Sequence, residues 1–331
     1  MKRTLLPFVF LMFPVLVFSQ ARVQVIHNSA DAAAAEVDVY LDDVLAVDNF
    51  AFRTATPFID FPADVEVVIG IAPPNSSSAS DAIATFPVTL MDGETYVVVA
   101  DGIVSLTGYD PAPPFGLEVY PMGREAATTG TNTDVLVHHG STDAPTVDVA
   151  EVGVGAGTIV DDLAYTDFQG YLELPTNDYT LEIQDASGTT AVAQFSAPLS
   201  TLGLDGAALV VVASGFLDPS NNSDGPAFGL WVALPSGGDM VELPPVPLSV
   251  QENIRNAFAV YPNPVENTLT IQGLEVGNFG MTVIDMQGRI ILTQNNINES
   301  FQLDVSSLAQ GIYNVTIQVG NQSVVKRFIK R

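Results

Sequence analysis

The chain has 331 residues, and its 11 Lys and Arg face 38 Asp and Glu, so the formal net charge at pH 7 is −27. Nucleic-acid binders neutralise phosphates with Lys and Arg, so this excess of carboxylates excludes a nucleic-acid partner. Hydrophobic residues make up 47% of the sequence, which is enough for a large buried core. There is no cysteine, which excludes disulfides, thiolate catalysis and cysteine zinc sites.

The first 19 residues are predicted to be a signal peptide. Lys2 and Arg3 precede an apolar run over residues 5–18, and small or polar residues follow from Ser19. The run is shorter than the roughly 20 residues that span a bilayer. We predict cleavage after Ser19, passage through the periplasm and no transmembrane segment in the mature protein. The alternative is an uncleaved membrane anchor.

An internal repeat occupies the middle of the chain. Residues 23–32 have a counterpart in residues 135–144, at an offset of 112, and Val97-Val98-Val99-Ala100 returns as Val210-Val211-Val212-Ala213 at an offset of 113. This period is far longer than that of a solenoid, so each copy is predicted to be a whole domain with its own core. The predicted bounds are 20–127 and 128–243.

Each copy is predicted to be an antiparallel β-sandwich. Segments such as residues 36–41 and 179–183 alternate apolar and polar side chains with a period of two. Asp-Gly pairs such as Asp92-Gly93 supply turns between them. The expected fold class is therefore all-β, with two tandem antiparallel sandwiches followed by a smaller C-terminal one.

Both copies open with the motif H-x-S-x-D, followed by V-D-V. The motif residues are His27, Ser29 and Asp31 in the first copy and His139, Ser141 and Asp143 in the second. With this motif, both copies resemble the bacterial secreted family called domain of unknown function 4397. The resemblance implies a secreted or cell-surface β domain and assigns no chemistry to it.

The same motif superficially offers a nucleophile, a base and an acid. Residues two apart on a strand lie about 6.5 to 7 Å apart, which is beyond the contacts that a catalytic triad needs. We expect Asp31 to accept backbone N–H bonds in an Asx-turn and His27 to cap the strand end. The alternative is catalysis or metal ligation.

A glycine-rich segment, residues 153–157, resembles a phosphate loop, but no Lys-Ser or Lys-Thr pair follows it. It is predicted to be a flexible connection. The zinc-protease motif H-E-x-x-H and the hydrolase motif G-x-S-x-G are absent from the sequence. No enzyme class is supported by a motif.

Carboxylate and amide groups cluster in the loop over residues 218–225, and calcium prefers such oxygen ligands. The predicted calcium ligands are Asp218, Asn221 and Asp224. The alternative for these and the other acidic pairs is solvated surface charge.

Two Pro-rich loops, around residues 109–115 and 218–228, are the expected ligand-binding regions. Aromatic rings in or near them could stack on sugars, and they belong to Tyr109, Phe115, Phe228 and Trp231. The alternative for these rings is core packing.

The charge pattern changes after a linker-like stretch, Pro235 to Gly238, and three further prolines. Residues 21–250 hold 3 basic and 32 acidic residues, whereas residues 255–331 hold 6 basic and 5 acidic ones. We predict a linker over 244–257 and a separate β module over 258–331 with a basic, exposed end.

This module is similar to the type A sorting domain of the type IX secretion system of Bacteroidota. The residues that carry the similarity are Pro262, Asn263, Pro264, Gly288, Arg289, Gly311, Tyr313, Lys326, Arg327 and Lys330. The resemblance implies an immunoglobulin-like sandwich that the secretion machinery recognises. The cargo is then either released or attached to surface polysaccharide.

Together these features predict a non-catalytic protein, secreted or held at the outer-membrane surface, that serves as a binding or structural module. Its expected ligands are extracellular glycans or peptides. The alternative is a secreted hydrolase that uses paired carboxylates and acts on glycans, since two acids at a suitable separation could support this on almost any fold.

Overall fold

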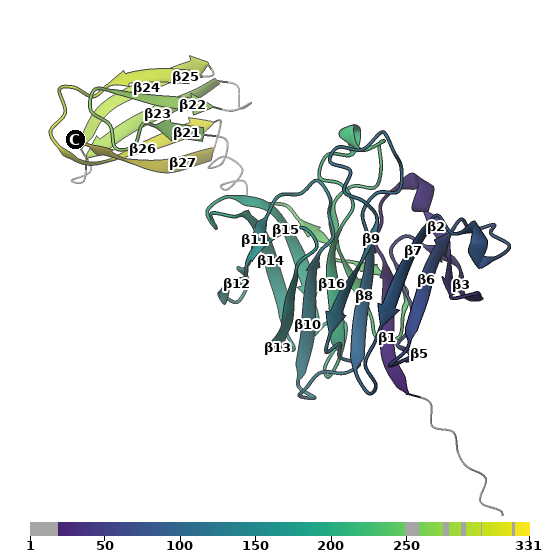
Figure 1. Ribbon diagram of the computed structural model, residues 1–331. Helices are drawn as coiled ribbons and strands as arrows, with labels where there is room; N and C mark the ends of the chain where they lie inside the picture. The colour runs from purple at the N-terminus through teal and green to yellow at the C-terminus, as the bar shows by residue number, and fades with distance from the viewer. Residues whose placement is uncertain (1–18, 249–257, 274–277, 286–288, 299, 320–321) are drawn as a thin grey trace, which may run out of the picture. The chain divides into compact units, whose positions relative to one another are not determined.

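The computed structural model describes residues 19–248, 258–273, 278–285, 289–298, 300–319 and 322–331, and it is all-β (Figure 1). Within these ranges, the helices are three single 3-10 turns: η1 (Ala32–Ala34), η2 (Ala79–Asp81) and η3 (Pro219–Asn221). No helix in the described part of the chain is long and apolar enough to span a membrane. The predicted fold class is confirmed. The predicted signal peptide lies almost wholly outside the described residues.

The chain divides into two compact units. The first unit contains residues 1–144, 164–177 and 199–243, and the second contains residues 145–163, 178–198 and 244–331.

The first copy forms a sandwich of two sheets in the first unit. One sheet has the order β18-β4-β1-β8-β9, with β5 also paired to β1, and the other has the order β3-β2-β6-β7. The strands are β1 (Gln20–His27), β2 (Glu36–Leu41), β3 (Val44–Ala51), β4 (Thr54–Ala55), β5 (Ile59–Pro62), β6 (Glu66–Ala72), β7 (Ala84–Thr89), β8 (Thr95–Asp101), β9 (Gly116–Pro121) and β18 (Gly238–Asp239). Val23 and Val98 from one sheet and Val39 and Ile71 from the other lie in one buried cluster.

A third sheet of the first unit comes from the second copy, with the order β13-β10-β16-β17-β19. Its strands are β10 (Asn132–His139), β13 (Phe168–Pro175), β16 (Ala208–Ser214), β17 (Gly229–Ala233) and β19 (Val241–Glu242). A second buried cluster joins this sheet to the first copy, with Ile26, Val97 and Val99 packed together with Leu136 and Val210. The two copies therefore share a core in addition to the core of the first sandwich.

The strands at the centre of these two sheets are parallel. β1 pairs with β8, and β10 pairs with β16, in the same direction. The sequence predicted only antiparallel pairing with one solvated face. Val97, Val98 and Val99 are all at most 4% exposed, because the β1-β8 sheet carries a core on both faces. A strand that is buried on both faces has a continuous apolar run rather than an alternating one.

The stretch Pro235 to Gly238 is not a linker. Gly238 and Asp239 form β18, which pairs with Ala55 and Thr54 of the first copy. A short strand near the end of the second copy thus pairs with the sheet of the first.

The second unit contains the remaining sheet of the second copy, in the order β12-β11-β14-β15-β20. Its strands are β11 (Val147–Glu151), β12 (Gly157–Leu163), β14 (Asp178–Asp185), β15 (Ala191–Pro198) and β20 (Pro245–Val246). The start of the predicted linker is therefore part of a sheet, because Pro245 and Val246 pair with β15.

The C-terminal module has two sheets, β21-β22-β25 and β24-β23-β26-β27. Its strands are β21 (Phe258–Tyr261), β22 (Thr268–Gly273), β23 (Asn278–Asp285), β24 (Ile290–Asn298), β25 (Ser300–Asp304), β26 (Gly311–Val319) and β27 (Gln322–Lys330). Phe258 and Ile271 from the first sheet and Val315 and Phe328 from the second share one buried core.

Candidate functional site

The H-x-S-x-D motif of the first copy holds a loop in place. Ser29 Oγ donates to the carbonyl of Gly102 over 2.6 Å, and His27 Nε2 donates to the carbonyl of Ala34 over 2.7 Å. Asp31 accepts from three N–H groups: that of Ala33 at 2.9 Å, that of Val104 at 2.8 Å and that of Ser105 at 2.6 Å. His27, Ser29 and Asp31 are all at most 1% exposed.

The motif of the second copy does the same at the equivalent loop. Ser141 Oγ donates to the carbonyl of Gly215 over 2.7 Å. Asp143 accepts from the N–H groups of Leu217 and Asp218, each at 2.7 Å. The backbone partners of the second copy lie 113 residues after those of the first, so the arrangement is duplicated with the sequence.

These contacts confirm the Asx-turn predicted for Asp31. Burial alone would raise the pKa of Asp31, but its bonds from Ala33, Ser105 and Val104 outweigh burial and lower that pKa. Burial lowers the pKa of His27 to about 4, so its ring is neutral at pH 7. Ser29 and His27 each bond a backbone carbonyl, so the motif does not assemble a nucleophile with its base.

The two loops that the motifs hold, residues 102–115 and 215–228, meet each other and are called the loop platform here. The Tyr109 and Phe216 ring centroids are 5.6 Å apart. Asp110 N donates to Asn222 Oδ1 over 3.1 Å, and Ser223 Oγ donates to the Gly108 carbonyl over 2.8 Å. The loops follow β8 and β16 in the two copies (Figure 1).

Each platform loop begins at a glycine that no other residue could replace without strain. Gly102 has φ +88° and Gly215 has φ +85°, a region that L side chains rarely adopt. A Cβ atom at Gly102 would lie 2.4 Å from the Pro114 carbonyl oxygen, and one at Gly215 would lie 2.3 Å from that of Ala227. Each loop therefore closes tightly on its own first residue.

The four predicted ligand-binding aromatics do not form one surface. Tyr109 belongs to the platform, and its hydroxyl accepts from Ala32 N over 2.9 Å. Phe115 packs on the first core beside Phe86, with centroids 6.0 Å apart. Trp231 packs against the cluster shared by the two copies, and Phe228 is half-buried. The platform instead exposes aliphatic side chains that sequence reasoning missed, Leu106 at 98% and Leu217 at 47%.

The predicted calcium ligands are held by donors within their own loop. Asp218 accepts from Ser220 Oγ over 2.6 Å and from Asn221 Nδ2 over 2.7 Å. These neighbours lower the pKa of Asp218, with the Ser220 hydroxyl the largest cause. Asp224 is exposed. In the part of the chain that the structure describes, no three His, Cys, Asp or Glu side chains form a group that could hold a metal ion. The calcium site stays a prediction.

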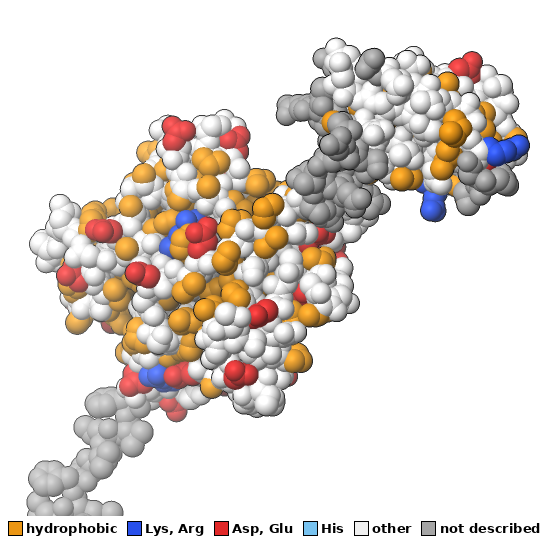
Figure 2. Space-filling view, turned by 180° about the vertical axis from the view of Figure 1, so that it is seen from behind, with side chains coloured by type: hydrophobic (Ala, Val, Ile, Leu, Met, Phe, Trp, Pro, Cys, Tyr) orange, Lys and Arg blue, Asp and Glu red, His pale blue; other side chains and the backbone are white. Residues whose placement is uncertain are grey.

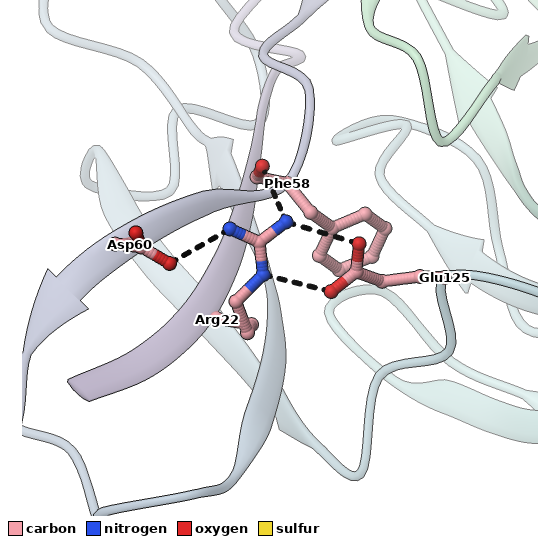
Figure 3. Close-up of polar contacts among 4 residues, drawn as sticks. All are labelled: Arg22, Phe58, Asp60 and Glu125. Atoms are coloured by element: carbon pink, nitrogen blue, oxygen red, sulfur yellow. Dashed lines mark hydrogen bonds and ion pairs between the residues drawn. The ribbon is translucent and has the colours of Figure 1, made fainter.

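Two adjacent residues near the end of the first copy, Arg124 and Glu125, form charged contacts, and Figure 3 shows the contact of Glu125 with Arg22. Arg22 of the first copy bonds Glu125 through Nε over 2.8 Å and Asp60 over 2.8 Å. The neighbouring Arg124 bonds Asp134 over 2.6 Å and Glu173 over 2.8 Å in the second copy.

The repeat explains this arrangement, because Arg22 and Asp134 occupy equivalent positions, as do Asp60 and Glu173. The position of Arg22 thus carries the opposite charge, that of Asp134, in the second copy. The adjacent residues Glu125 and Arg124 supply the opposite charge to each.

Arg53 makes a further contact between the copies. Its guanidinium lies 4.1 Å from the Trp231 ring centroid and donates to the carbonyl of Ala227 over 2.9 Å and to Ser214 Oγ over 3.0 Å. Burial lowers the pKa of Arg53 to about 10. Arg22, Arg53 and Arg124 are the three basic residues between residues 21 and 250, and two of them, Arg53 and Arg124, bond residues of the second copy.

A buried polar group also crosses between the copies. His138 Nε2 donates to Asp101 Oδ2 over 2.6 Å, and Asn28 Nδ2 donates to Asp101 Oδ1 over 2.6 Å and to the Gly140 carbonyl over 3.1 Å. Nearby, burial and the charge of Asp101 raise the pKa of Glu118. Sequence reasoning missed this group because His138 aligns with Ile26 in the repeat, so no shared motif marks it.

The glycine-rich segment is a closed turn rather than a loose connection. The N–H groups of Gly153, Val154, Gly155 and Ala156 all donate to the carboxylate of Glu151, over 2.8 to 3.2 Å. The segment does bind an anion, as a phosphate loop does, but the anion is its own side chain.

In the C-terminal module, Asn263 bonds the last strand. Asn263 Nδ2 donates to the Arg327 carbonyl over 3.1 Å, and Ile329 N donates to Asn263 Oδ1 over 2.9 Å. Val265 continues this contact, because its N–H donates to the Ile329 carbonyl over 2.8 Å.

The other predicted sorting residues have varied positions. Pro262, Pro264 and Gly311 are exposed, the Tyr313 hydroxyl donates to the Ala309 carbonyl, and Arg289 bonds Asp285 over 2.6 Å. Gly288 lies outside the described residues. The basic end is only partly exposed: Arg327 is exposed and Lys326 is half-buried, whereas Lys330 is 8% exposed. Lys330 is buried because its side chain points to the inner side of β27, the side of Phe328.

Residues 259–331 match the family model described as "Secretion system C-terminal sorting domain", which implies interaction with the type IX secretion machinery. With its all-β fold, this match defines a β-rich protein that is exported across the outer membrane to the cell surface or the extracellular space. Residues 21–113 and 133–219, more than half of the chain, match "Domain of unknown function (DUF4397)". The chain belongs to the DUF4397 family.

Comparison with curated proteins gives no match. Among solved structures, PorZ of Porphyromonas gingivalis, described as an essential surface component of the type IX secretion system, is 18% identical with a TM-score of 0.22, over 49% of this chain and 21% of that one. The Bacillus anthracis TIE protein is 10% identical with a TM-score of 0.17, over 94% and 48% of the two chains. The BSP domain of a biofilm-associated protein is 9% identical with a TM-score of 0.19, over 95% and 90%. The chain thus spans about a fifth of PorZ and about half of TIE.

Proposed function

We propose that the exported chain is a non-catalytic binding module whose ligand, an extracellular glycan or peptide, contacts the loop platform. One observation carries this proposal: both copies use the motif that could have been catalytic to hold two loops, and those loops dock on each other. Binding sites are commonly built from loops that a rigid scaffold positions. The platform also exposes two large aliphatic side chains, Leu106 and Leu217, which a ligand could contact.

The acidic surface is consistent with this function. Figure 2 shows Asp and Glu side chains distributed singly over the visible face of the larger body. Such charges keep an exported protein soluble and disfavour adhesion to anionic surfaces.

The test is binding of the mature chain to arrays of extracellular glycans and peptides. We expect Leu106→Ser to weaken binding of any ligand found by at least tenfold. Val44→Ser is the matched control, because Val44 is 68% exposed on β3 and lies outside the platform. Equal binding by Leu106→Ser, Leu217→Ser and the unsubstituted chain would refute the platform as the site.

The rival function, a hydrolase that uses carboxylates, is best represented by Glu118, whose pKa is raised by burial and by Asp101. A raised pKa suits a general acid. The test is glycosidase activity of the mature chain toward polysaccharides. Activity that is lost in Glu118→Gln would establish this rival and exclude a purely binding role.

A further inference from the structure

The last strand of the chain lies at the edge of its sheet. β27 pairs with β26 on one side only. In an antiparallel pair, the N–H and C=O groups of one residue point to the same side, and successive residues alternate. Ile329 points both groups away from β26, toward Asn263 and Val265. Val325 and Arg327 have the same parity and therefore point their groups to the same outer edge.

One half of this outer edge is already covered. Asn263 occupies the Arg327 carbonyl and the Ile329 N–H, and Val265 occupies the Ile329 carbonyl and the Arg331 N–H. The other half is open. In the described ranges, no backbone partner contacts the N–H of Arg327 or either group of Val325. Unpaired strand edges bind other extended chains unless they are blocked.

The side chains along the open half have a definite pattern. Val325 is 55% exposed, Arg327 is exposed and Ile329 is 42% exposed, all on the outer face of the sheet. A hollow at this place is lined by Asn314, Val325, Lys326 and Arg327. Four of the five basic residues of the module lie from Lys326 to Arg331, in a chain whose net charge is −27. Figure 2 shows basic and apolar side chains close together on the visible face of this module.

We propose that the open edge of β27, from Val325 to Arg327, receives an extended segment of the secretion machinery in which acidic and apolar side chains alternate. The backbone groups of Val325 and Arg327 set the register, as in other cases of strand addition. Cross-strand neighbours interact in pairs, so a carboxylate lies beside Arg327 and an apolar side chain lies beside Val325. The contact of Asn263 ends the open edge, which limits the added strand to a short one.

Hydrogen exchange on the full mature chain tests the proposal without a substitution. The probe is a synthetic peptide of alternating Val and Glu, and the matched control peptide has Lys in place of Glu. We expect the Val/Glu peptide to slow exchange at the amides of Val325 and Arg327 by at least tenfold, while the Ile329 amide, which already bonds Asn263, changes little. The Val/Lys peptide should have no effect. Equal protection by both peptides, or by neither, refutes the proposal. Protection of these amides that appears when the chain is concentrated without peptide also refutes the proposal, because it would assign the edge to a second copy.

Two substitutions extend the test to export. Arg327→Glu keeps every backbone bond and should reverse the peptide preference to Val/Lys while reducing export at least tenfold. Val325→Pro removes one outward N–H and keeps the pairing with β26, because proline is tolerated on an edge strand. Val325→Ala is its control. Melting temperatures of the purified chains separate loss of the edge from loss of the fold. Normal export of folded Arg327→Glu and Val325→Pro would overturn the role of this edge in secretion.

Discussion

Asp31 shows how a single carboxylate decides the shape of a loop. It accepts three backbone N–H groups and the Ser105 hydroxyl, at 2.8 Å, while being 1% exposed. A polar group that loses its partner in a buried place costs more than the net value of the bond that it made. Asp31 is therefore expected to contribute more to the free energy of unfolding than an exposed acidic residue does.

We expect Asp31→Asn to lower the free energy of unfolding by about 3 kcal/mol, because the amide cannot replace both carboxylate oxygens as acceptors. Urea denaturation measures the change. Asp110→Asn is the control in the same platform, since Asp110 is exposed, and it should stay near zero. A loss shared equally by the two variants would show a general charge effect instead.

Glu151 makes the folding stability of the protein depend on pH. Burial alone would raise the pKa of Glu151, but its bonds from the glycine-rich turn and Thr180 outweigh burial and lower that pKa. A carboxyl with a lowered pKa in the folded state stabilises the fold above its unfolded pKa of about 4.3, and this stabilisation is lost as pH falls through the lower folded pKa.

The prediction is that Glu151→Gln destabilises the chain at pH 7 and that the difference from the unsubstituted chain shrinks as pH falls from 5 toward 3. Denaturation curves across this range provide the measurement, with Asp161→Asn on β12 as an exposed control. A difference that stays constant down to pH 3 would contradict the role of the Glu151 charge.

At the scale of elements, the side-chain amide of Asn263 makes the hydrogen bonds to the edge of β27 that a neighbouring strand would otherwise make. Its amide donates to β27 and accepts from β27, as a neighbouring backbone would. The sequence marked Asn263 as part of a family motif, yet the reason for the asparagine is visible only when residues 263 and 329 are brought together.

We expect Asn263→Ala to lower the stability of the C-terminal module by about 1 kcal/mol and to speed hydrogen exchange at the Ile329 amide. Asn298→Ala, at an exposed position of β24, is the matched control. Unchanged exchange at Ile329 would mean that Val265 alone holds the strand end.

The alternation of apolar and polar residues was enough to predict an all-β fold, because most strands have one solvated face. It could not predict the parallel pairing of β1 with β8, because burial on both faces removes the alternation from Val97, Val98 and Val99. Nor could it predict that Gly238 joins the first copy, because two residues of strand carry no periodic signal. The platform was predicted as two separate loops, while their contact depends on a packing of the copies that no local pattern encodes.

At the scale of the whole molecule, the shared core makes the stability of each copy depend on the other. Ile26, Val97 and Val99 would be partly exposed if the second copy unfolded alone, and exposure of apolar area is unfavourable. The two copies are therefore expected to unfold in one transition.

Trp231, the only tryptophan, lies in the second copy and reports this directly. We expect Ile71→Ala, in the core of the first copy, to cost about 3 kcal/mol and to shift the unfolding midpoint seen by Trp231 fluorescence. Val44→Ala, at an exposed site of the same sheet, should leave the midpoint in place. An unmoved Trp231 transition in Ile71→Ala would show that the copies unfold independently.

Each of the three arginines between residues 21 and 250 already bonds groups within residues 21–250: Arg22 and Arg124 bond carboxylates, and Arg53 bonds Ser214 and a backbone carbonyl. With 32 acidic residues and no arginine left over, one such body offers a neighbouring body no opposite charge to pair with. Like charges repel over about 10 Å at 0.1 M salt, so we expect crowded copies of this protein to keep a gap of that order, which widens in fresh water and narrows in brine.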